Sequence, residues 1–158
     1  MEFRRELKES DINDLRGILV STGFFYDFEV EVALELAQEN LTKGEEKSGY
    51  IFIIVEHDNR VLAYACYGKN TCTFHSYDLY WMVVHQDEKG KGIGKMMLKM
   101  VDEDVARLGG KNIWIETSSR QLYEPTRAFY ENTDCEKVAE LPDYYGVNDS
   151  KVVYLRKV

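Results

Sequence analysis

Cysteine is scarce in this sequence and forms no pattern that suggests a disulfide or a metal site. The three cysteines, Cys66, Cys72 and Cys135, are an odd number with no Cys-x-x-Cys pair, so neither a disulfide framework nor a thiolate zinc site is indicated. The three histidines show no zinc-ligand spacing either. The chain is therefore expected to bind no metal and to work in a reducing cytoplasm.

Long apolar runs are also absent. The first residues, MEFRRELKESD, are charged where a secretory signal peptide needs an apolar stretch of about 7–15 residues. No later run approaches the ~20 apolar residues that span a bilayer. A protein with no membrane segment, located in the cytoplasm, is expected.

Internal repeats, low-complexity tracts and linkers rich in Pro, Gly or Ser are missing as well. The 158 residues suffice for one compact domain that buries roughly two thirds of its unfolded surface. A single domain over residues 1–158 is therefore expected.

Basic residues are the minority among the charged ones. The 20 Lys and Arg residues stand against 28 Asp and Glu, which gives a net charge of -8. Most of such a surface repels a phosphate backbone, which argues against nucleic-acid binding and favours a cationic partner such as an amine. Four lysines nevertheless gather near one glycine-rich segment. They are Lys89, Lys91, Lys95 and Lys99.

Hydrophobic periodicity predicts an α/β fold. A short strand near residues 3–7 is followed by two helical patterns, one with Ser10 as N-cap and one ending before Gly44. Further strands are predicted over residues 50–56, 61–67, 73–84, 112–117, 138–141 and 152–157, and further helices over 92–109 and 126–132. Residues 57–60 have the polarity of a hairpin turn. A strand, a helix and a strand in succession imply parallel pairing, so the sheet is expected to be mixed.

The segment KGKGIGK, from Lys89 to Lys95, joins the long strand to the following helix. Its glycines let the backbone turn tightly and leave amide hydrogens uncovered at a helix N-terminus, which favours an anion. The lysines beside them add positive charge. The segment predicts a pyrophosphate site, and an ordinary strand-to-helix turn with solvated lysines is the alternative.

Two common phosphate-binding motifs do not fit this segment. A Walker A loop needs a glycine where Lys89 stands and a Ser or Thr where Met96 stands. A dinucleotide fingerprint starting at Gly90 needs a small residue where Lys95 stands, and it belongs to an early βαβ unit. A standard P-loop is therefore excluded, and a Rossmann site is disfavoured.

The long strand and the loop together resemble motif A of the GNAT superfamily of acetyltransferases. In that motif a strand is followed by Gln/Arg-x-x-Gly-x-Gly/Ala at a helix start. Here YDLYWMVV, over residues 77–84, precedes KGKGIG, over residues 89–94. Lys89 stands in place of the usual Gln or Arg.

A second block, IETSSRQLYEPTRAFYEN over residues 115–132, is similar to the family's later strand and tyrosine-bearing helix. Tyr130 holds the tyrosine position. The family's Gly-Phe pair is replaced by Asp134 and Cys135, and Tyr123 stands where many members have asparagine. The motifs follow the family's order and spacing from the long strand to the C-terminal strand.

This resemblance implies a GNAT-like fold, with a mixed, mostly antiparallel central sheet, a splayed parallel strand pair and flanking helices. It also implies an N-acetyltransferase in which an amine directly attacks the thioester of acetyl-CoA, the co-substrate. The residues that it assigns to acetyl-CoA are Met82, Val83, Val84, Lys89, Gly90, Lys91, Gly92, Ile93, Gly94 and Lys95. The backbone of the first three would hold the pantetheine arm and polarise the thioester carbonyl.

By the same resemblance, Tyr130 is the candidate general acid that protonates the departing thiolate. An acceptor ammonium must also lose a proton before it attacks, which requires a base or a chain of waters. Glu116 is the first candidate for this base, and Asp78 and His85 come after it. The alternative for Glu116 is a solvated or structurally paired carboxylate.

The acceptor site is harder to predict from the sequence. Aromatic residues near the N-terminal helices and the last hairpin either surround a cationic amine, with acidic residues nearby, or pack under the helices. They are Phe24, Phe25, Tyr26, Tyr144 and Tyr145, with Asp27, Glu29 and Asp143. The acidic balance favours a small amine or amino acid over a protein lysine.

Other functions stay open at this point. One is a non-catalytic acyl-CoA-binding sensor, which keeps the loop but lacks productive acid and base groups. Another is an interaction module in which the C-terminal strand pairs between two copies of the chain as a homodimer. The retained tyrosine at position 130 argues against the sensor, and dimerisation is compatible with catalysis.

Overall fold

The computed structural model describes every residue of the chain, 1–158. Its residues divide into two compact units. Unit 1 consists of Met1–Gly68 and Tyr80–Val101, and unit 2 consists of Lys69–Leu79 and Asp102–Val158. The expectation of one domain over the whole chain stays a prediction.

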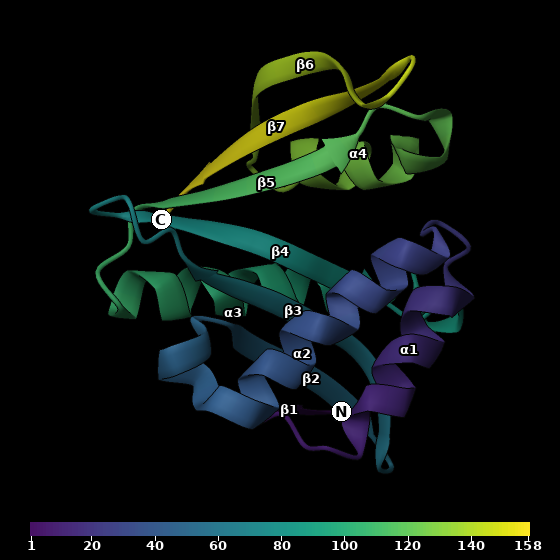
Figure 1. Ribbon diagram of the computed structural model, residues 1–158, viewed down its shortest axis with the longest axis vertical. Coiled ribbons are helices and arrows are strands. Elements are labelled where there is room, and N and C mark those ends of the chain that lie inside the picture. The colour runs from purple at the N-terminus through teal and green to yellow at the C-terminus, as the bar shows by residue number, and fades with distance from the viewer. The chain divides into compact units, whose positions relative to one another are not determined.

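Seven strands and four α-helices make up the chain, with two short 3-10 helices between them (Figure 1). In chain order they are β1 (Glu2–Arg4), α1 (Asp11–Ser21), α2 (Asp27–Ser48), β2 (Ile51–His57), β3 (Arg60–Lys69), β4 (Ser76–Val84), η1 (Gln86–Glu88), α3 (Ile93–Arg107), β5 (Asn112–Ser118), η2 (Gln121–Tyr123), α4 (Glu124–Glu131), β6 (Glu136–Gly146) and β7 (Asp149–Lys157).

The strands are hydrogen-bonded in the order β1-β2-β3-β4-β5-β7-β6. The pairs β1–β2, β2–β3, β5–β7 and β6–β7 are antiparallel. The pair β4–β5 is parallel, and its register runs from Ser76↔Asn112 only as far as Leu79↔Ile115. The predicted mixed, mostly antiparallel sheet with one parallel pair is confirmed.

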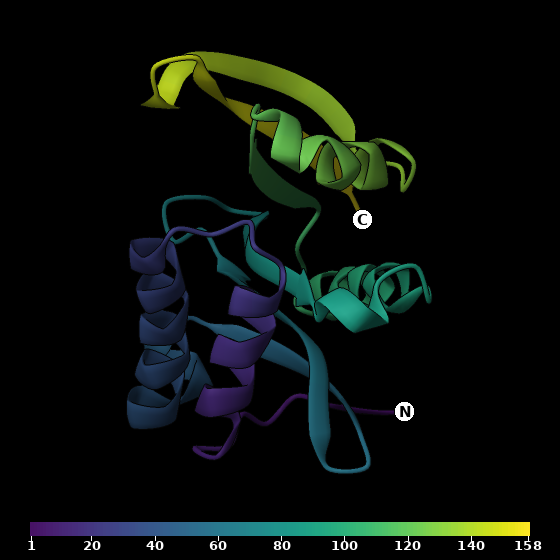
Figure 2. The same cartoon turned by 90° about the vertical axis from the view of Figure 1, so that its right-hand side faces the viewer.

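In unit 1, helices cover both faces of the strands. Apolar residues of α1 and α2, among them Leu15, Ile18 and Leu34, form one buried cluster with Phe52 and Ile54 of β2. Because side chains alternate along a strand, neighbours such as Ile53 face the opposite side, where α3 lies (Figure 2). Deleting one such side chain typically costs about 2–5 kcal/mol, so these clusters hold the strands and helices in place.

The hairpin between β2 and β3 forms where the sequence predicts it. Asp58 and Asn59 connect the strands with φ angles of 49° and 61°. Positive φ at both central residues is the type I′ geometry that suits two-residue hairpins, and Asn and Asp tolerate it better than most residues.

Several helix and strand ends differ from the prediction. Ser10 stands at the N-cap of α1 but makes no side-chain cap hydrogen bond. The carboxylate of Asp11 instead accepts a hydrogen bond from the backbone N–H of Lys8 at 2.8 Å. Gly44 leaves helical geometry with φ 82°, yet α2 resumes after this kink and ends at Ser48. β6 spans Glu136–Gly146, well beyond the predicted residues 138–141.

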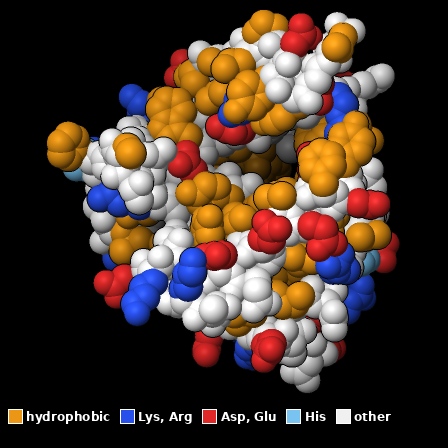
Figure 3. Space-filling model, in the orientation of Figure 1, with side chains coloured by type: hydrophobic (Ala, Val, Ile, Leu, Met, Phe, Trp, Pro, Cys, Tyr) orange, Lys and Arg blue, Asp and Glu red, His pale blue; other side chains and the backbone are white.

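In unit 2, α4 packs on one face of the strands β5, β7 and β6. The ring of Tyr130 on α4 lies 5.8 Å from that of Tyr154 on β7, measured between centroids. Every residue of β6 is exposed, and hydrophobic side chains gather over β6 and β7 in Figure 3. Gly110 precedes β5 at a position without room for a side chain, because an added Cβ would lie 2.7 Å from the Tyr77 ring.

Candidate functional site

The second half of β4 leads into the glycine loop within unit 1. No β4–β5 register pair follows Leu79, so the backbone of Met82, Val83 and Val84 lies beyond the parallel ladder. Val83 is buried in the unit 1 cluster. The backbone of these residues therefore fits the assignment to the pantetheine arm, which stays a prediction.

The glycine loop opens directly onto the N-terminus of α3. Gly90 and Gly92 have φ angles of 78° and 82°, in the left-handed region, and an added Cβ at either would meet nothing within 4 Å. The N–H of Met96 donates to the carbonyl of Gly92 at 3.1 Å. The three N–H groups before it, from Ile93 to Lys95, have no acceptor within the helix, and they lie at the positive end of its dipole. The backbone thus has the open, donor-rich form that an anion such as pyrophosphate requires.

The lysines of the loop have different surroundings. The ammonium of Lys89 lies 4.2 Å from the centroid of the Phe24 ring, and burial lowers its pKa. The ammonium of Lys91 forms an ion pair with Glu88 at 2.8 Å, which lowers the pKa of that carboxyl. Glu88 therefore offsets part of the positive charge that the sequence predicts here.

Tyr130, the candidate general acid, is buried on α4 in unit 2. Burial raises the pKa of its phenol well above the ordinary value, and Cys135 and Tyr154 nearby raise it further. A phenol in this environment keeps its proton at neutral pH. That is the protonation state that a proton donor needs.

Glu116, the candidate base, is ion-paired with Lys151 of β7 at 2.9 Å. Its side chain is 50% exposed, whereas that of Lys151 is only 12% exposed. Asp78 of β4 belongs to the same group of charges. Its pKa is raised mainly by burial and also by the Glu116 carboxylate, while a hydrogen bond from Asn70 and the charge of Lys151 lower it.

Two of the predicted acceptor residues, Tyr144 and Tyr145, interact with the pair of Glu116 and Lys151. The ammonium of Lys151 lies 3.9 Å from the centroid of the Tyr144 ring. Burial and the Glu116 carboxylate together raise the pKa of Tyr145 to about 12. The structure thus brings these two tyrosines, Glu116 and Asp78 together around one ammonium in unit 2.

The remaining predicted acceptor residues make structural contacts. Phe25 packs edge-on against Trp81 in unit 1, with centroids 5.3 Å apart. The carboxylate of Glu29 accepts a hydrogen bond from the N–H of Tyr26 at the start of α2. The carboxylate of Asp143 accepts one from the N–H of Asn148 and so closes the last hairpin. The contact of Phe25 is compatible with the packing alternative, and the acceptor site stays a prediction.

His85 also has a local role. Its Nδ1 accepts a hydrogen bond from the N–H of Asp87 at 3.2 Å, at the start of η1. Its backbone N–H donates to the carbonyl of Leu62 at 2.8 Å. These bonds fix the turn between β4 and the glycine loop.

Sequence reasoning missed Lys151. The residue lies one position before the predicted strand 152–157, and its partners Glu116 and Tyr144 lie on other strands. Its ion pair with Glu116 and its contact with the Tyr144 ring depend on how these strands pair, because Ser118 of β5 and Leu141 of β6 both stand opposite Lys151.

The structure contains no group of three or more His, Cys, Asp or Glu residues that could hold a metal ion. None of its helices is long and apolar enough to cross a membrane.

The family model of the acetyltransferase (GNAT) family matches residues 14–133 of the chain. Comparison with curated protein sequences gives no match.

Solved structures similar to the chain include one with substantial sequence identity. It is a crystal structure from Desulfovibrio desulfuricans of a protein assigned to the GNAT family of acetyltransferases, with 37% identity, a TM-score of 0.95, and coverage of 99% of this chain and 98% of that one.

Two more distant structures share the fold alone. An aminoglycoside 6'-N-acetyltransferase complexed with coenzyme A has 16% identity and a TM-score of 0.77, over 99% of this chain and 97% of that one. The ribosomal-protein-S18-alanine N-acetyltransferase from Escherichia coli has 14% identity and a TM-score of 0.76, over 99% of this chain and 93% of that one.

Proposed function

Because the chain belongs to the GNAT family of acetyltransferases, whose members use acetyl-CoA as co-substrate, we propose that it is an acetyl-CoA-dependent N-acetyltransferase. Its acceptor is a primary amine of a small molecule or amino acid, which attacks the thioester directly in a ternary complex. The observation that carries this proposal is the open glycine loop at the N-terminus of α3, where Gly90 and Gly92 adopt φ angles of 78° and 82°.

The loop would bind the pyrophosphate of acetyl-CoA. The N–H groups at the start of α3 donate to the phosphate oxygens, and Lys89 and Lys95 add charge. Lys91 contributes less, since Glu88 pairs with it at 2.8 Å. Backbone groups of Met82 and Val84 bind the pantetheine arm, and an amide near Val83 polarises the carbonyl, a contribution of roughly 3 kcal/mol in comparable sites.

Tyr130 would donate the proton that the departing thiolate of coenzyme A takes up. The raised pKa of the buried phenol keeps it protonated and available for transfer. Tyr130→Phe removes the proton and keeps the ring, so turnover is expected to fall about 10²–10⁴-fold. Turnover unchanged between about pH 6 and pH 10 would remove this role from Tyr130.

Glu116 would accept the proton that the acceptor ammonium loses before attack. Its side chain is half exposed, so water can carry that proton onward. The carboxylate is already paired with the ammonium of Lys151 at 2.9 Å, so an acceptor ammonium must compete with that lysine for it. Asp78 is the second candidate, because its pKa is raised by burial and by Glu116.

The acidic surface supports a cationic acceptor. A net charge of -8 attracts a cationic amine. Among proteins of the same fold, one is named for the 6' amino group of aminoglycosides and another for the alanine of ribosomal protein S18. Both substrates are primary amines, one on a small molecule and one on a protein. The fold therefore accommodates either size.

Two alternatives remain beside this proposal. A protein-lysine acetyltransferase uses the same loop and the same chemistry on a larger acceptor. A non-catalytic acyl-CoA sensor keeps the loop and transfers nothing. A homodimer paired through the C-terminal strand is compatible with each of them and stays a prediction.

Two measurements separate these functions. Calorimetry with acetyl-CoA and with plain CoA is expected to show binding in the micromolar range, and no binding at high micromolar concentration would remove the enzyme and the sensor together. Release of free thiol is then followed against a panel of small amines, amino acids and lysine peptides. Binding without thiol release on any acceptor would favour the sensor.

A further inference from the structure

The ammonium of Lys151 is held in unit 2 as a bound alkylammonium would be. It pairs with the Glu116 carboxylate at 2.9 Å and lies 3.9 Å from the centroid of the Tyr144 ring. A carboxylate and an aromatic face are the two groups that bind organic ammonium ions most effectively. The side chain of Lys151 is only 12% exposed, so its ammonium is held by these groups largely away from solvent.

The surroundings carry more negative charge than one lysine neutralises. Asp78 lies close enough that the charges of Glu116 and Lys151 shift its pKa in opposite directions. The same two charges act on Tyr145. The ammonium of Lys151 thus contacts Glu116 and Tyr144 directly and interacts electrostatically with Asp78 and Tyr145, and no other basic side chain accompanies it in these interactions. The excess of negative charge suits a site for a cation.

The hairpin that carries the two tyrosines is loosely tied to its neighbour. In the β6–β7 ladder Leu141 pairs with Lys151, and the next pair is Gly146 with Asp149. Residues 142–145 of β6 therefore stand against Ser150 alone on β7. Since residues 142–145 have no partner in the β6–β7 register, a shift of Tyr144 and Tyr145 breaks none of its pairs.

We propose that Glu116, Asp78, Tyr144 and Tyr145 form a subsite for a primary alkylammonium ion, and that Lys151 is its intramolecular occupant. An acceptor ammonium enters this subsite only when the Lys151 side chain withdraws. Its ligand is a primary ammonium on an unbranched aliphatic chain, because that is the shape of the side chain the subsite now holds. The role as an acceptor site rests on the proposed acetyltransferase function, whereas the binding of an alkylammonium does not.

The tethered ammonium of Lys151 competes with every external alkylammonium ion, and it therefore lowers the apparent affinity of the subsite for such ions. An acceptor binds only to the fraction of molecules in which the subsite is free, so its apparent dissociation constant rises by that factor. Lys151 would therefore determine which amines the protein accepts. A ligand must offer contacts beyond its ammonium to displace a side chain that is already in place.

The test uses the fragment that Lys151→Ala removes. This substitution takes away three methylene groups and the ammonium, so n-propylammonium chloride is the matched probe and n-propanol the uncharged control. Lys151→Met removes the charge but keeps the space filled. Calorimetry without coenzyme A compares the three proteins after circular dichroism has verified their folding. If Lys151→Ala does not fold, Lys151→Thr with ethylammonium replaces it, since threonine favours strands.

We expect n-propylammonium to bind Lys151→Ala at least about tenfold more tightly than the wild-type protein or Lys151→Met. Glu116→Gln in the Lys151→Ala background should abolish this gain, and n-propanol should show none. Equal binding to the three proteins would overturn the proposal. So would a gain that survives Glu116→Gln, because the binding would then not depend on the carboxylate.

Acetyl transfer is a separate measurement. With acetyl-CoA present, Lys151→Ala should acetylate propylamine faster than the wild-type protein does. Tight binding of propylammonium without its acetylation, while another amine is acetylated, would overturn the assignment of this subsite to the acceptor. Absence of transfer to any amine would instead count against the proposed enzyme function and leave the binding result unchanged.

Discussion

The ammonium of Lys89 lies 4.2 Å from the centroid of the Phe24 ring, which joins the glycine loop to the segment between α1 and α2. Burial lowers the pKa of this ammonium. A cation over an aromatic face is worth about 0.5–1 kcal/mol at an exposed site. A phosphate that approaches the loop competes for the same charge, because charge-assisted hydrogen bonds to phosphate are among the stronger ones.

Lys89→Met removes this charge and keeps an aliphatic chain against Phe24. We expect the affinity for coenzyme A, measured by calorimetry at low salt, to fall roughly tenfold, since a hydrogen bond to a charged group contributes about 1.5–3 kcal/mol. At about 0.5 M salt the difference should shrink through screening. Lys47→Met, at an exposed position on α2, is the matched control. An unaltered affinity of Lys89→Met at low salt would contradict the assignment of Lys89 to phosphate.

Gly92→Ala places a side chain where φ is 82°. Left-handed geometry costs a residue with a Cβ about 1–2 kcal/mol, and the new methyl group points into the open space of the loop. We expect coenzyme A binding to weaken at least about tenfold and the free energy of unfolding to fall by about 1 kcal/mol. Both are measured on the same preparation, by calorimetry and by urea unfolding.

Gly17→Ala is the control for this glycine. Gly17 lies within α1, where an added Cβ meets nothing within 4 Å and no positive φ is required. Alanine should raise the free energy of unfolding by about 0.5–1 kcal/mol there and leave coenzyme A binding unchanged. If Gly92→Ala behaved in the same way, the left-handed loop would not matter for binding.

The buried phenol of Tyr130 is expected to make the free energy of unfolding fall as the pH rises into the alkaline range. Its folded-state pKa is raised above the ordinary value of 10.0 by burial, so the unfolded chain ionises first as the pH rises. The stabilisation linked to this phenol is complete below about pH 10 and declines as the pH increases from there. Tyr130→Phe should therefore lose less stability than the wild-type protein between about pH 9 and pH 11.5 in urea unfolding.

The control for this comparison is an exposed tyrosine. Tyr26→Phe alters a side chain that is 52% exposed, so it removes one tyrosine hydroxyl without changing the buried phenol. Equal losses for Tyr130→Phe and the wild-type protein would mean that Tyr130 is no more protected from ionisation than in the unfolded chain.

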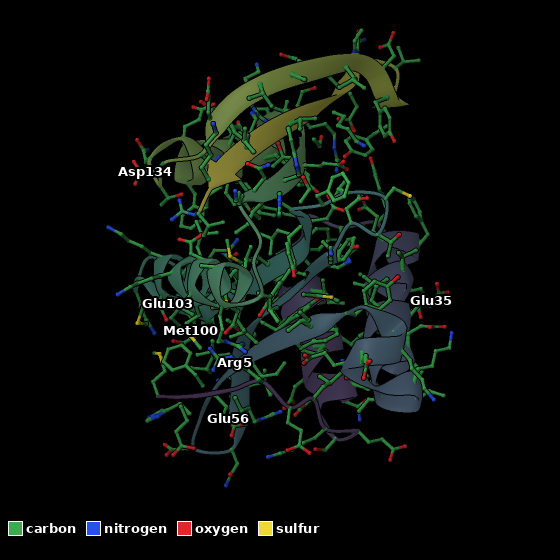
Figure 4. The ribbon with its side chains drawn as sticks, turned by 90° about the vertical axis from the view of Figure 1, so that its left-hand side faces the viewer. Arg5, Glu35, Glu56, Met100, Glu103 and Asp134 are labelled. Atoms are coloured by element: carbon green, nitrogen blue, oxygen red, sulfur yellow. The ribbon has the colours of Figure 1, made fainter.

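Asp134 follows α4 with a φ of 60° (Figure 4). The GNAT pattern has glycine at this position, and the left-handed conformation explains the preference. We expect Asp134→Gly to raise the free energy of unfolding by about 0.5 kcal/mol, and Asp134→Val to lower it by about 1–2 kcal/mol. Asp134→Asn should stay near the wild-type value because asparagine tolerates this geometry. If Asp134→Val had the same free energy of unfolding as the wild-type protein, the left-handed conformation at this position would not explain the preference for glycine.

The parts of the fold that local sequence determines were predicted well. The Asp58-Asn59 turn needs only two adjacent residues that accept positive φ. The pattern of buried residues in α3, such as Met97 and Val101, repeats at helical spacing. In both cases the signal lies within a few residues of the structure that it predicts.

The prediction was less accurate where residues from other segments of the chain determine the local structure. Ser10 holds the expected N-cap position of α1 but makes no side-chain cap hydrogen bond, and Asp11 accepts hydrogen bonds from Arg4 of β1 and from the N–H of Lys8. β6 was expected only over residues 138–141, but it extends through Pro142 and the charged Asp143 to Gly146. β6 lies at the end of the strand order, where it has one neighbouring strand and tolerates both.

In the candidate site, too, the features that local sequence determines were predicted, and those that depend on residues from different strands were not. The glycine loop is one continuous segment, so its backbone form could be expected from its own residues. The charge of Lys91 was overestimated, because Glu88 lies three residues earlier and pairs with it. Lys151 could not be expected at all, since the register of three strands brings it to Glu116 and Tyr144.

Several acidic residues on α2 lie at exposed positions. Glu35 lies on the outer face of this helix (Figure 4), and Glu31 pairs with Arg16 of α1 at 2.6 Å. Both positions are exposed, where such pairs contribute little to stability. Their effect is on the field around the protein, which favours the approach of cations.

The loose register of the last hairpin bears on how this protein can evolve. Between Leu141 and Gly146, four residues of β6 face one residue of β7, so insertions or replacements there leave the β5–β7 ladder intact. In the ammonium subsite that we propose, mutations in this segment would change which amine binds, while the glycine loop belongs to a different stretch of chain. On that proposal, a gene of this kind would acquire new acceptors by small steps, each of which keeps a folded protein with an intact loop.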